Sequence, residues 1–531
     1  MPDNVIIGVN MLETLTTGMY RDAKVIFREY IQNSCDQIDE AVDTGLLKQN
    51  EGTVEIWIED DSVFIEDNAT GIPTTLFKEK LYNIGKSDKS PERSRGFRGI
   101  GHWCGFAHCK SLIFKSKANG EAIESVMACD AEKMRSMMLE CRLKRADYSI
   151  DDVLSSTTEF FENPISDLNS HYFKVEMYGI VDAKEELCNL QNVKEYLSFI
   201  IPVKYAPEFH FRNQIHKYAN KIEQHIEEYD VRIKGEAVFK KYQPSFDTRG
   251  KGSDTITSVQ FKEFRDDKSN LVAWMWFGVS AFKAQIIPAS KMRGIRLRSR
   301  NIQIGEEDAL QKLFNESNGR GLYYYIGEVF AVSTELLPDS QRDYFEPGNA
   351  RTQFERFLFE FFNSELRSIY YAGSKIGSAT DKILKVEKIK SDIEALGESV
   401  TGEKISELEH AIEDAEKANQ ELTKIREKNE TKLETNECGT AEIVINKILK
   451  SNAEKLAPSM KPAKPTTSGK IPPKMTDKTF APTDTTVYQQ NSPLASMDKL
   501  VSLSKIREII RKSTDSSIAD AIIAKIDEEL N

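Results

Sequence analysis

Several features that would define a protein class are missing from this 531-residue chain. It has no run of about 18 apolar residues, the length that a helix needs to cross a bilayer. Its first residues, MPDNVIIGVNMLETLTTG, lack the basic segment and apolar core of a secretion signal. Seven cysteines, an odd number with no CxxC pair, argue against a disulfide framework. We therefore expect a protein of the reducing cytoplasm that does not associate with membranes.

Positive charge is also in short supply. The chain has 72 Lys and Arg against 84 Asp and Glu, a formal net charge of −12. This balance argues against nucleic-acid binding by the surface as a whole, although a local basic patch stays possible. With 40% apolar and 29% charged residues, the composition is that of a globular protein with exposed helix.

Residue patterns divide the chain into five segments. Helix and strand patterns alternate over residues 1–183, and residues 184–350 form a second mixed α/β block. In residues 351–450, apolar residues at heptad spacing on both sides of GESVTGE predict a helical hairpin or coiled coil. Residues 451–495 hold seven of the seventeen prolines and predict a disordered linker, and residues 496–531 predict a tail of two short helices.

The stretch FREYIQNSCDQIDEA, residues 27–41, predicts one helix with two opposed faces. An apolar stripe includes Ile31, Cys35 and Ile38 at spacings of four and three. The opposite stripe is polar and consists of Glu29, Asn33, Asp36 and Glu40. A polar stripe on an amphipathic helix is usually solvated, so later segments must decide whether this one lines a pocket.

Two glycine-containing turns follow that helix. EDNATGIP comes directly after the predicted hairpin TVEIWIEDDSVFIED and carries Asp67 and Gly71. GFRGIGHWCGF carries Gly96, Gly99 and Gly101 where a helix is expected to begin, so its free amides could hold phosphate. It follows no first strand of a Rossmann unit and has no Walker lysine after it.

The order of these three segments resembles the Bergerat nucleotide-binding fold of the GHKL ATPases, which include gyrase B subunits, MutL, MORC proteins, histidine kinases and the ninety-kilodalton heat-shock chaperones. Three further segments are similar to the chaperones. IGKSDK resembles their Ile-x-Lys-Ser segment, GIRLRSRNIQIG a middle-domain strand, and LLPDSQRDYFEP, residues 336–347, their Leu-Pro-Leu-Asn-x-Ser-Arg-Glu loop. The resemblance covers about residues 10–350 and implies an α+β chain. A two-layer α/β sandwich that binds nucleotide (1–183) precedes a transducer-like α/β domain (184–350) and the helical segments.

The resemblance implies ATP and Mg²⁺ as ligands and gives individual residues roles. Glu29 would activate the attacking water, Asn33 would bind Mg²⁺ through its amide oxygen, and Asp36 would lie near the sugar. Asp67 would accept a hydrogen bond from the adenine amino group, and Gly71 would let the backbone pass beneath the base.

Phosphate contacts are implied from a lid, residues 83–101, and from the second domain. Arg342 corresponds to the chaperone arginine that reaches the terminal phosphate, and Lys291 is a second, lower-ranked phosphate contact. The lid residues implied to wrap or touch the phosphates are Lys86, Gly96, Arg98, Gly99, Ile100 and Gly101.

Two positions depart from the family pattern. Ala69 stands where the family has the middle glycine of Asp-x-Gly-x-Gly. Because alanine does not readily adopt a positive φ, weaker adenine binding is expected. The usual threonine before the last strand is not visible, and Ser170 in NSHYFKVEMYG is a possible substitute.

Two other clusters allow more than one interpretation. In KMRGIRLRSRN, strand alternation puts Arg296, Arg298 and Arg300 on one face, which would be a solvated surface, a nucleic-acid track or a positive wall beside the nucleotide. A zinc site is a disfavoured alternative for His102, Cys104, His108 and Cys109. These residues fall inside the glycine loop and the helix after it, where the loop and helix determine the spacing.

Two functions are therefore expected from the resemblance. The first is a chaperone-like ATPase in which ATP closes the lid, Arg342 clamps the second domain and two protomers associate through their N-terminal segments to act on a protein client. The alternative is an ATP-gated nucleic-acid clamp of MORC or MutL type, or a subunit of a bacterial defence complex, with weak hydrolysis. Both imply a homodimer.

Overall fold

A computed structural model describes residues 9, 12, 18, 22–85, 94–96, 99–396, 400–435 and 438–456 of the chain. Two compact units are present. The first comprises Met1–Asp247, Thr255–Val279 and Ile286–Glu360, and the second Thr248–Asp254, Ser280–Gln285 and Phe361–Asn531. The predicted lid cations Lys86 and Arg98, the tail 496–531 and the linker from residue 457 onward lie outside the described residues.

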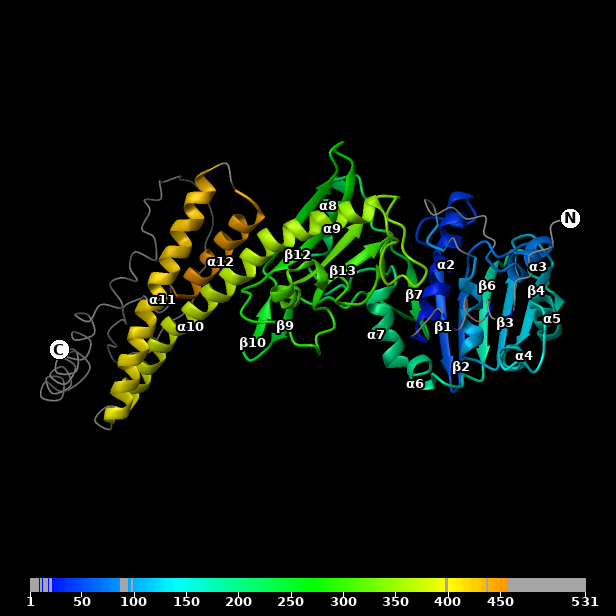
Figure 1. Cartoon of the computed structure of the whole chain (residues 1–531), viewed down its shortest axis with the longest axis horizontal. Helices are drawn as coiled ribbons and strands as arrows, with labels where there is room; N and C mark the ends of the chain where they lie inside the picture. Colours follow the sequence, from blue (N-terminus) through cyan, green and yellow to red (C-terminus); the bar gives the residue numbers. More distant parts are fainter. Residues whose placement is uncertain are drawn as a thin grey trace, which may run out of the picture. The chain divides into compact units, whose positions relative to one another are not determined.

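The first unit begins with an eight-stranded mixed sheet in the order β5-β4-β3-β6-β2-β1-β7-β8 (Figure 1). Neighbours are antiparallel except for β1 and β7, which are parallel. Residues beyond position 183 thus complete the sheet that the N-terminal segment starts. Its strands are β1 (Thr53–Glu59), β2 (Ser62–Asp67), β3 (Ser111–Lys117), β4 (Ile123–Asp130), β5 (Thr158–Pro164), β6 (Tyr172–Tyr178), β7 (Asp230–Ile233) and β8 (Glu236–Ala237).

Helices cover one face of this sheet and make a two-layer α/β sandwich. Val54, Ile56 and Ile58 of β1 are buried while their neighbours are half-exposed, because alternate side chains of a strand point to opposite faces. The covering helices pack their apolar stripes onto this face. They are α2 (Val25–Asp43), α3 (Thr74–Tyr82), the 3₁₀ helix η1 (Gly101–Ala107), α4 (Ala131–Arg142), α5 (Ile150–Thr157), α6 (Lys184–Leu187) and α7 (Leu190–Ile200).

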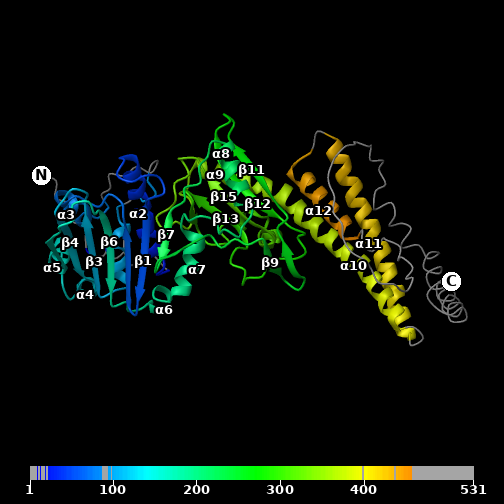
Figure 2. The ribbon, with the colours of Figure 1, turned by 180° about the vertical axis from the view of Figure 1, so that it is seen from behind.

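The first unit also holds a five-stranded sheet in the order β11-β12-β15-β13-β14 (Figure 2). Strand β12, between β11 and β15, is buried along almost its whole length, with Trp274 and Trp276 in the core. The elements of the first unit around this core are α8 (Arg212–Lys221), β9 (Ser245–Thr248), β11 (Ser258–Arg265), β12 (Leu271–Val279), β13 (Gly294–Ser299), β14 (Ile302–Ile304), η2 (Gln311–Leu313), η3 (Glu316–Tyr324), β15 (Ile326–Ala331) and α9 (Asn349–Phe361). Most of β10 (Gly252–Thr255) belongs to the second unit.

The predicted basic face of this second sheet does not exist. Arg298 is fully buried and pairs with Glu328 at 2.6 Å. Arg296 is buried too, and Arg300 binds Glu227 at 2.9 Å. The three arginines form neither a solvated surface nor a nucleic-acid track. The reason is that β13 lies between β14 and β15, and neighbouring segments supply partners for its side chains: Glu328 for Arg298, and Gln303 for Arg296 at 2.8 Å.

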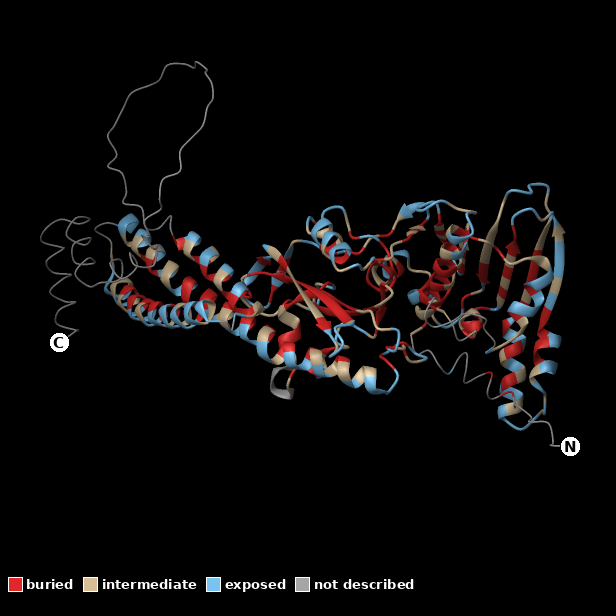
Figure 3. Ribbon diagram, turned by 90° about the horizontal axis from the view of Figure 1, so that it is seen from above, coloured by how far each residue is buried: buried red, intermediate tan, exposed pale blue. Residues whose placement is uncertain are grey.

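The second unit is helical. It contains the π-helical turn η4 (Phe362–Leu366), α10 (Arg367–Leu396), α11 (Gly402–Glu434) and α12 (Thr440–Leu456). Helices α10 and α11 pack through side chains spaced three and four apart, among them Ile389, Ile412 and Ala415, and buried residues follow the facing sides of these helices in Figure 3. Helix α12 continues through Leu456, past the predicted start of the linker at residue 451. None of the helices described here is long and apolar enough to span a membrane.

Candidate nucleotide-binding site

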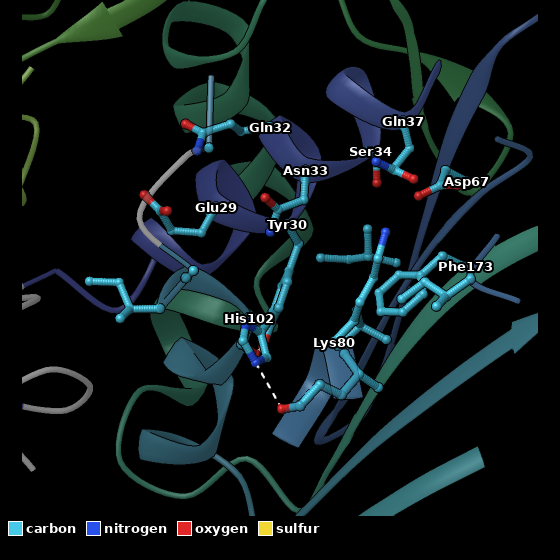
Figure 4. A pocket seen from close by; sticks show the side chains of 18 of the residues that line it. Glu29, Tyr30, Gln32, Asn33, Ser34, Gln37, Asp67, Lys80, His102 and Phe173 are labelled. Carbon is cyan, nitrogen blue, oxygen red and sulfur yellow. Dashed lines mark hydrogen bonds between the residues drawn. The ribbon is translucent and has the colours of Figure 1, made fainter. Parts of the chain in front are cut away.

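A cavity of about 390 Å³ opens beside α2 in the first unit (Figure 4). Volumes of this order are typical of small-ligand sites. The cavity gathers segments that are far apart in the sequence: α2, the turn after β2, the glycine segment and the loop after β15. Its lining includes these predicted site residues: Glu29, Asn33, Asp67, Gly71, Gly96, Gly99, Ile100, Gly101 and Arg342.

The first two members of the polar stripe of α2, Glu29 and Asn33, face this cavity, whereas Glu40 is exposed. Ile31, Cys35 and Ile38 pack into the core beneath the helix, which turns the opposite face toward the cavity. Glu29 is 6% exposed, and Asn33, one turn later, lines the same wall. The cavity therefore receives a carboxylate and an amide from the same face of one helix.

Asp36 has a different place from the one implied by the family resemblance. Its two carboxylate oxygens accept hydrogen bonds from the backbone N–H groups of Arg95 at 2.9 Å and Gly96 at 3.0 Å. The Arg95 guanidinium also contacts Asp36 at 3.2 Å. Asp36 thus fixes the start of the glycine segment, and it does not belong to the lining of the cavity.

Two arginines surround the Glu29 carboxylate. Arg28 donates to it at 3.2 Å and also donates to the carbonyl of Gln341 at 3.1 Å. Arg342 approaches the same carboxylate at 4.0 Å. The loop after β15 therefore meets α2 at the end of the cavity that carries the carboxylate.

The glycine segment lies against α2 more closely than side chains would permit. A Cβ at residue 96 would lie 2.7 Å from Asn33 Oδ1, and one at residue 101 would lie 2.7 Å from Glu29 Oε2. These separations are shorter than van der Waals contact. The two glycines therefore create a cradle of main-chain atoms next to the carboxylate and the amide.

At the other end of the cavity Asp67 is 2% exposed, and it accepts a hydrogen bond from the Ala69 backbone N–H at 3.1 Å. Burial raises the pKa of its carboxyl to about 6, although hydrogen bonds from Ser34 and from the backbone oppose the shift. Figure 4 shows Asp67 next to Ser34, on the opposite side of the cavity from Glu29. Apolar side chains line this end: Ile65, Ile72, Phe173 and Val175.

Residues 22–158 match the family model described as histidine kinase-, DNA gyrase B-, and HSP90-like ATPase. The matched segment contains α2, the turn that carries Asp67 and the glycine segment. The match supports the GHKL superfamily for this segment of the chain. A search of curated proteins found no match to this chain.

Ala69 fits the GHKL domain without the expected strain. Its φ is not positive, and the left-handed conformation occurs at Gly71, where φ is +65°. A Cβ at residue 71 would overlap the carbonyl oxygen of Lys117. The conformational reason for weaker adenine binding at Ala69 is therefore absent.

Ser170 does not replace the missing threonine of the GHKL pattern. Its hydroxyl donates to the carbonyl of Asp167 at 3.1 Å, and the side chain does not line the cavity. Phe173 lies opposite Asp67 in the β2–β6 pairing and lines the cavity. An aromatic residue is thus the neighbour of Asp67 across the two strands, and only the strand register could reveal this.

The GHKL cavity contains further polar residues that the sequence analysis missed. Gln37 follows Asn33 by one turn, so helical periodicity could have found it, and Lys80 extends from α3 into the cavity (Figure 4). Burial lowers the pKa of His102 to about 4, and its neutral ring donates from Nε2 to the carbonyl of Leu81 at 3.0 Å. Gln32 and Ser34 of α2 are further polar residues of the lining.

The structure does not support Lys291 as a phosphate contact or the His/Cys group of the glycine loop as a zinc site. Lys291 is exposed and forms an ion pair with Glu195 at 3.7 Å, and it is not part of the lining. Within the described part of the chain, no three His, Cys, Asp or Glu side chains are grouped to hold a metal ion. Cys104 and Cys109 are buried in the core of the domain.

Proposed function

We propose that the GHKL domain binds ATP with Mg²⁺ and hydrolyses it, with Glu29 as the general base. The observation that carries this proposal is the pairing of Glu29 and Asn33 in a cavity next to Gly96 and Gly101. A carboxylate can activate water only from within hydrogen-bond reach, and glycines in the cavity lining allow a triphosphate to approach the main chain.

The opposite end of the cavity suits adenine. An ionised carboxylate only accepts hydrogen bonds, so Asp67 would bind an exocyclic amino group and disfavour the carbonyl that guanine presents there. Phe173 and the aliphatic side chains beside it supply an apolar slot for the ring. A base bound at this end would direct its phosphates toward Glu29, on the opposite side of the cavity.

Asn33 is the candidate ligand for Mg²⁺ because its amide oxygen is a hard donor at the phosphate cradle. The ion, when bound, would neutralise phosphate charge. Glu29 would accept a proton from the attacking water, and Arg342 would stabilise negative charge that develops on the terminal phosphate. The contact between Arg342 and the Glu29 carboxylate at 4.0 Å supports this role.

We further propose a nucleotide-driven clamp. Nucleotide binding would close the lid and draw in the loop that carries Arg342, and two protomers would associate through their N-terminal segments to hold a protein client. The contacts of that loop with α2 support coupling to the second sheet. The nucleic-acid alternative loses its main support because Arg296 and Arg298 are buried.

Turnover of ATP with Mg²⁺ by two variants tests the proposed roles. Glu29→Ala should bind ATP but lose turnover by about 100-fold or more, since a general base contributes that much. Asp67→Asn should lose ATP affinity. Glu40→Ala, at the exposed end of the same stripe, is the matched control and should behave like the parent. If both test variants hydrolyse ATP at the parental rate, these roles are wrong.

A further inference from the structure

A partly buried cluster of charged side chains, centred on the buried Arg95, lies outside the lining of the cavity. We call it the Arg95 cluster. Arg95 is 3% exposed and its guanidinium contacts Asp39 at 2.9 Å and Glu227 at 2.5 Å, in addition to Asp36. The cluster consists of Asp36, Asp39, Arg95, Glu227, Tyr229 and Arg300.

The main chain of Arg95 joins the cavity to the loop after β15. Its N–H donates to Asp36, and the next N–H, that of Gly96, donates to the second oxygen of the same carboxylate. Its carbonyl accepts a hydrogen bond from the Arg342 guanidinium. One residue therefore contacts α2 and Arg342, and immediately precedes a glycine of the phosphate cradle.

The side chain of Arg95 extends the connection toward the second sheet. Glu227 binds Arg95 through one carboxylate oxygen and Arg300 through the other, at 2.9 Å. The backbone carbonyl of Glu227 accepts from Asn301 at 2.6 Å, and Asn301 in turn accepts from Lys240 at 2.7 Å. Hydrogen bonds thus run without a gap from the glycine segment to the core of the second sheet.

The ionisation of Glu227 suits this role. Burial opposes its charged form, but the guanidinium groups of Arg95 and Arg300 outweigh burial and hold the pKa of this carboxyl below its usual value. A buried ion pair of this kind adds little to overall stability, because the loss of hydration offsets the attraction. It does fix the geometry of the groups it joins.

We propose that Arg95 is a positioning residue that couples the nucleotide at the glycine segment to Arg342 and the second sheet. The inference rests on the proposed ATPase function. Binding of the triphosphate beside Gly96 would fix the Arg95 carbonyl, which orients Arg342, while Glu227 holds the Arg95 side chain against the second sheet. If Arg95 had only a structural role, its contacts would stabilise the fold without affecting Arg342.

Glu227→Gln tests this coupling because it removes the charge and keeps the shape. The ATP dissociation constant should change by no more than about threefold, while kcat should fall by about tenfold or more because Arg342 is misplaced. The losses of kcat in Glu227→Gln and in Arg342→Lys should not add up in the double variant, since both changes act on Arg342. Glu236→Gln, which removes the carboxylate of an exposed pair with Lys194 at 2.6 Å, is the control and should leave both quantities unchanged.

Hydrogen exchange with a non-hydrolysable ATP analogue gives a second readout that does not depend on turnover. The analogue should protect residues 336–347 in the wild type and in Glu236→Gln, and this protection should be lost in Glu227→Gln although the analogue still binds. A wild type that binds ATP without turnover would overturn only the proposed hydrolysis, and the exchange experiment would still decide the coupling.

Three results would overturn the role of Arg95. One is that Glu227→Gln leaves kcat and the protection of residues 336–347 unchanged. Another is that Glu227→Gln lowers kcat, ATP affinity and the unfolding midpoint together, which would indicate that the ion pair only stabilises the fold. The third is a wild type that binds no ATP, which would overturn the proposed function as well.

Discussion

Asp67 combines deep burial with a direct place in the lining of the cavity. The pKa of about 6 means that its carboxylate takes up a proton just below neutral pH. Because this pKa is raised, the fraction of ionised acceptor falls as the pH falls through 6. Any ligand whose amino group donates to Asp67 should therefore bind less tightly in mild acid.

We expect the affinity for ATP to fall by about tenfold between pH 7.5 and pH 5 through this group, because one pH unit below the pKa leaves about a tenth of it ionised. Titration calorimetry at both pH values measures the change. Inorganic triphosphate is the control, since it shares the titrating phosphates and lacks the base. Equal pH dependence for the two ligands would contradict the role of Asp67.

Gly71 is a position where backbone conformation and space both require glycine. Gly71→Ala should lower the free energy of unfolding by at least about 2 kcal/mol, because a Cβ would meet the backbone of Lys117 at a positive φ. Gly45→Ala isolates the conformational part: its φ is +75° and no atom lies within 4 Å of the added Cβ. That control should cost about 1 kcal/mol. Urea denaturation of the two variants would show equal losses if the overlap at residue 71 were unimportant.

At the scale of elements, the second sheet is organised around one buried carboxylate. Glu328 of β15 is fully buried and accepts hydrogen bonds from Arg298 at 2.7 Å, Lys240 at 3.2 Å and Trp276 at 3.1 Å. Burial alone would raise its pKa, but the charges of Arg298 and Lys240 lower it to about 2. Since this folded-state pKa is depressed, the stability that the group contributes should be lost as the pH falls from about 4.5 toward 2.

Glu328→Gln should lower the free energy of unfolding of the first unit by about 3–5 kcal/mol, because it leaves two buried cations without their counter-ion. Glu263→Gln is the matched change on β11 of the same sheet: its partner Arg265 lies at 2.5 Å, and the pair is partly exposed. That control should cost less than about 1 kcal/mol. Similar losses from both changes, measured by chemical denaturation, would rule out a central role for Glu328.

At the scale of the whole molecule, the proposed clamp predicts that nucleotide controls association. The Glu29→Ala variant should keep ATP bound, so with ATP and Mg²⁺ it should accumulate as a dimer, whereas the nucleotide-free protein should be mostly monomeric. Mass photometry or light scattering measures the fraction of each species. Asp67→Asn, which should lose ATP affinity, is the control. An oligomeric state that is the same with and without ATP would contradict the clamp.

Local patterns predicted which face of α2 carries Glu29 and Asn33, although Asp36 on the same predicted stripe does not line the cavity. The three-and-four spacing of Ile31, Cys35 and Ile38 determined which face of α2 is buried, and this placed Glu29 and Asn33 on the other face. The positions of Asp67 and Gly71 followed from a hairpin and the turn after it. Such predictions succeed because helical and strand periods depend on neighbours in the sequence.

Burial of the second-sheet arginines could not be predicted in this way. Alternation correctly places Arg296 and Arg298 on one face of a strand, but it says nothing about what covers that face. Strand pairing supplied the answer, because β15 brings Glu328 beside them. The same limit applies to Phe173, whose place beside Asp67 depends on the β2–β6 register.

The sequence by itself determined the polar stripe of α2 and the position of the glycine segment, since short-range spacing and backbone freedom specify them, and its resemblance to a family implied the α+β class. Only the tertiary structure decided what those glycines contact and which charges meet. Arg95 and Arg342 are 247 positions apart and are joined by a hydrogen bond. Contacts over such separations depend on the packing of whole sheets, which no local pattern of residues encodes.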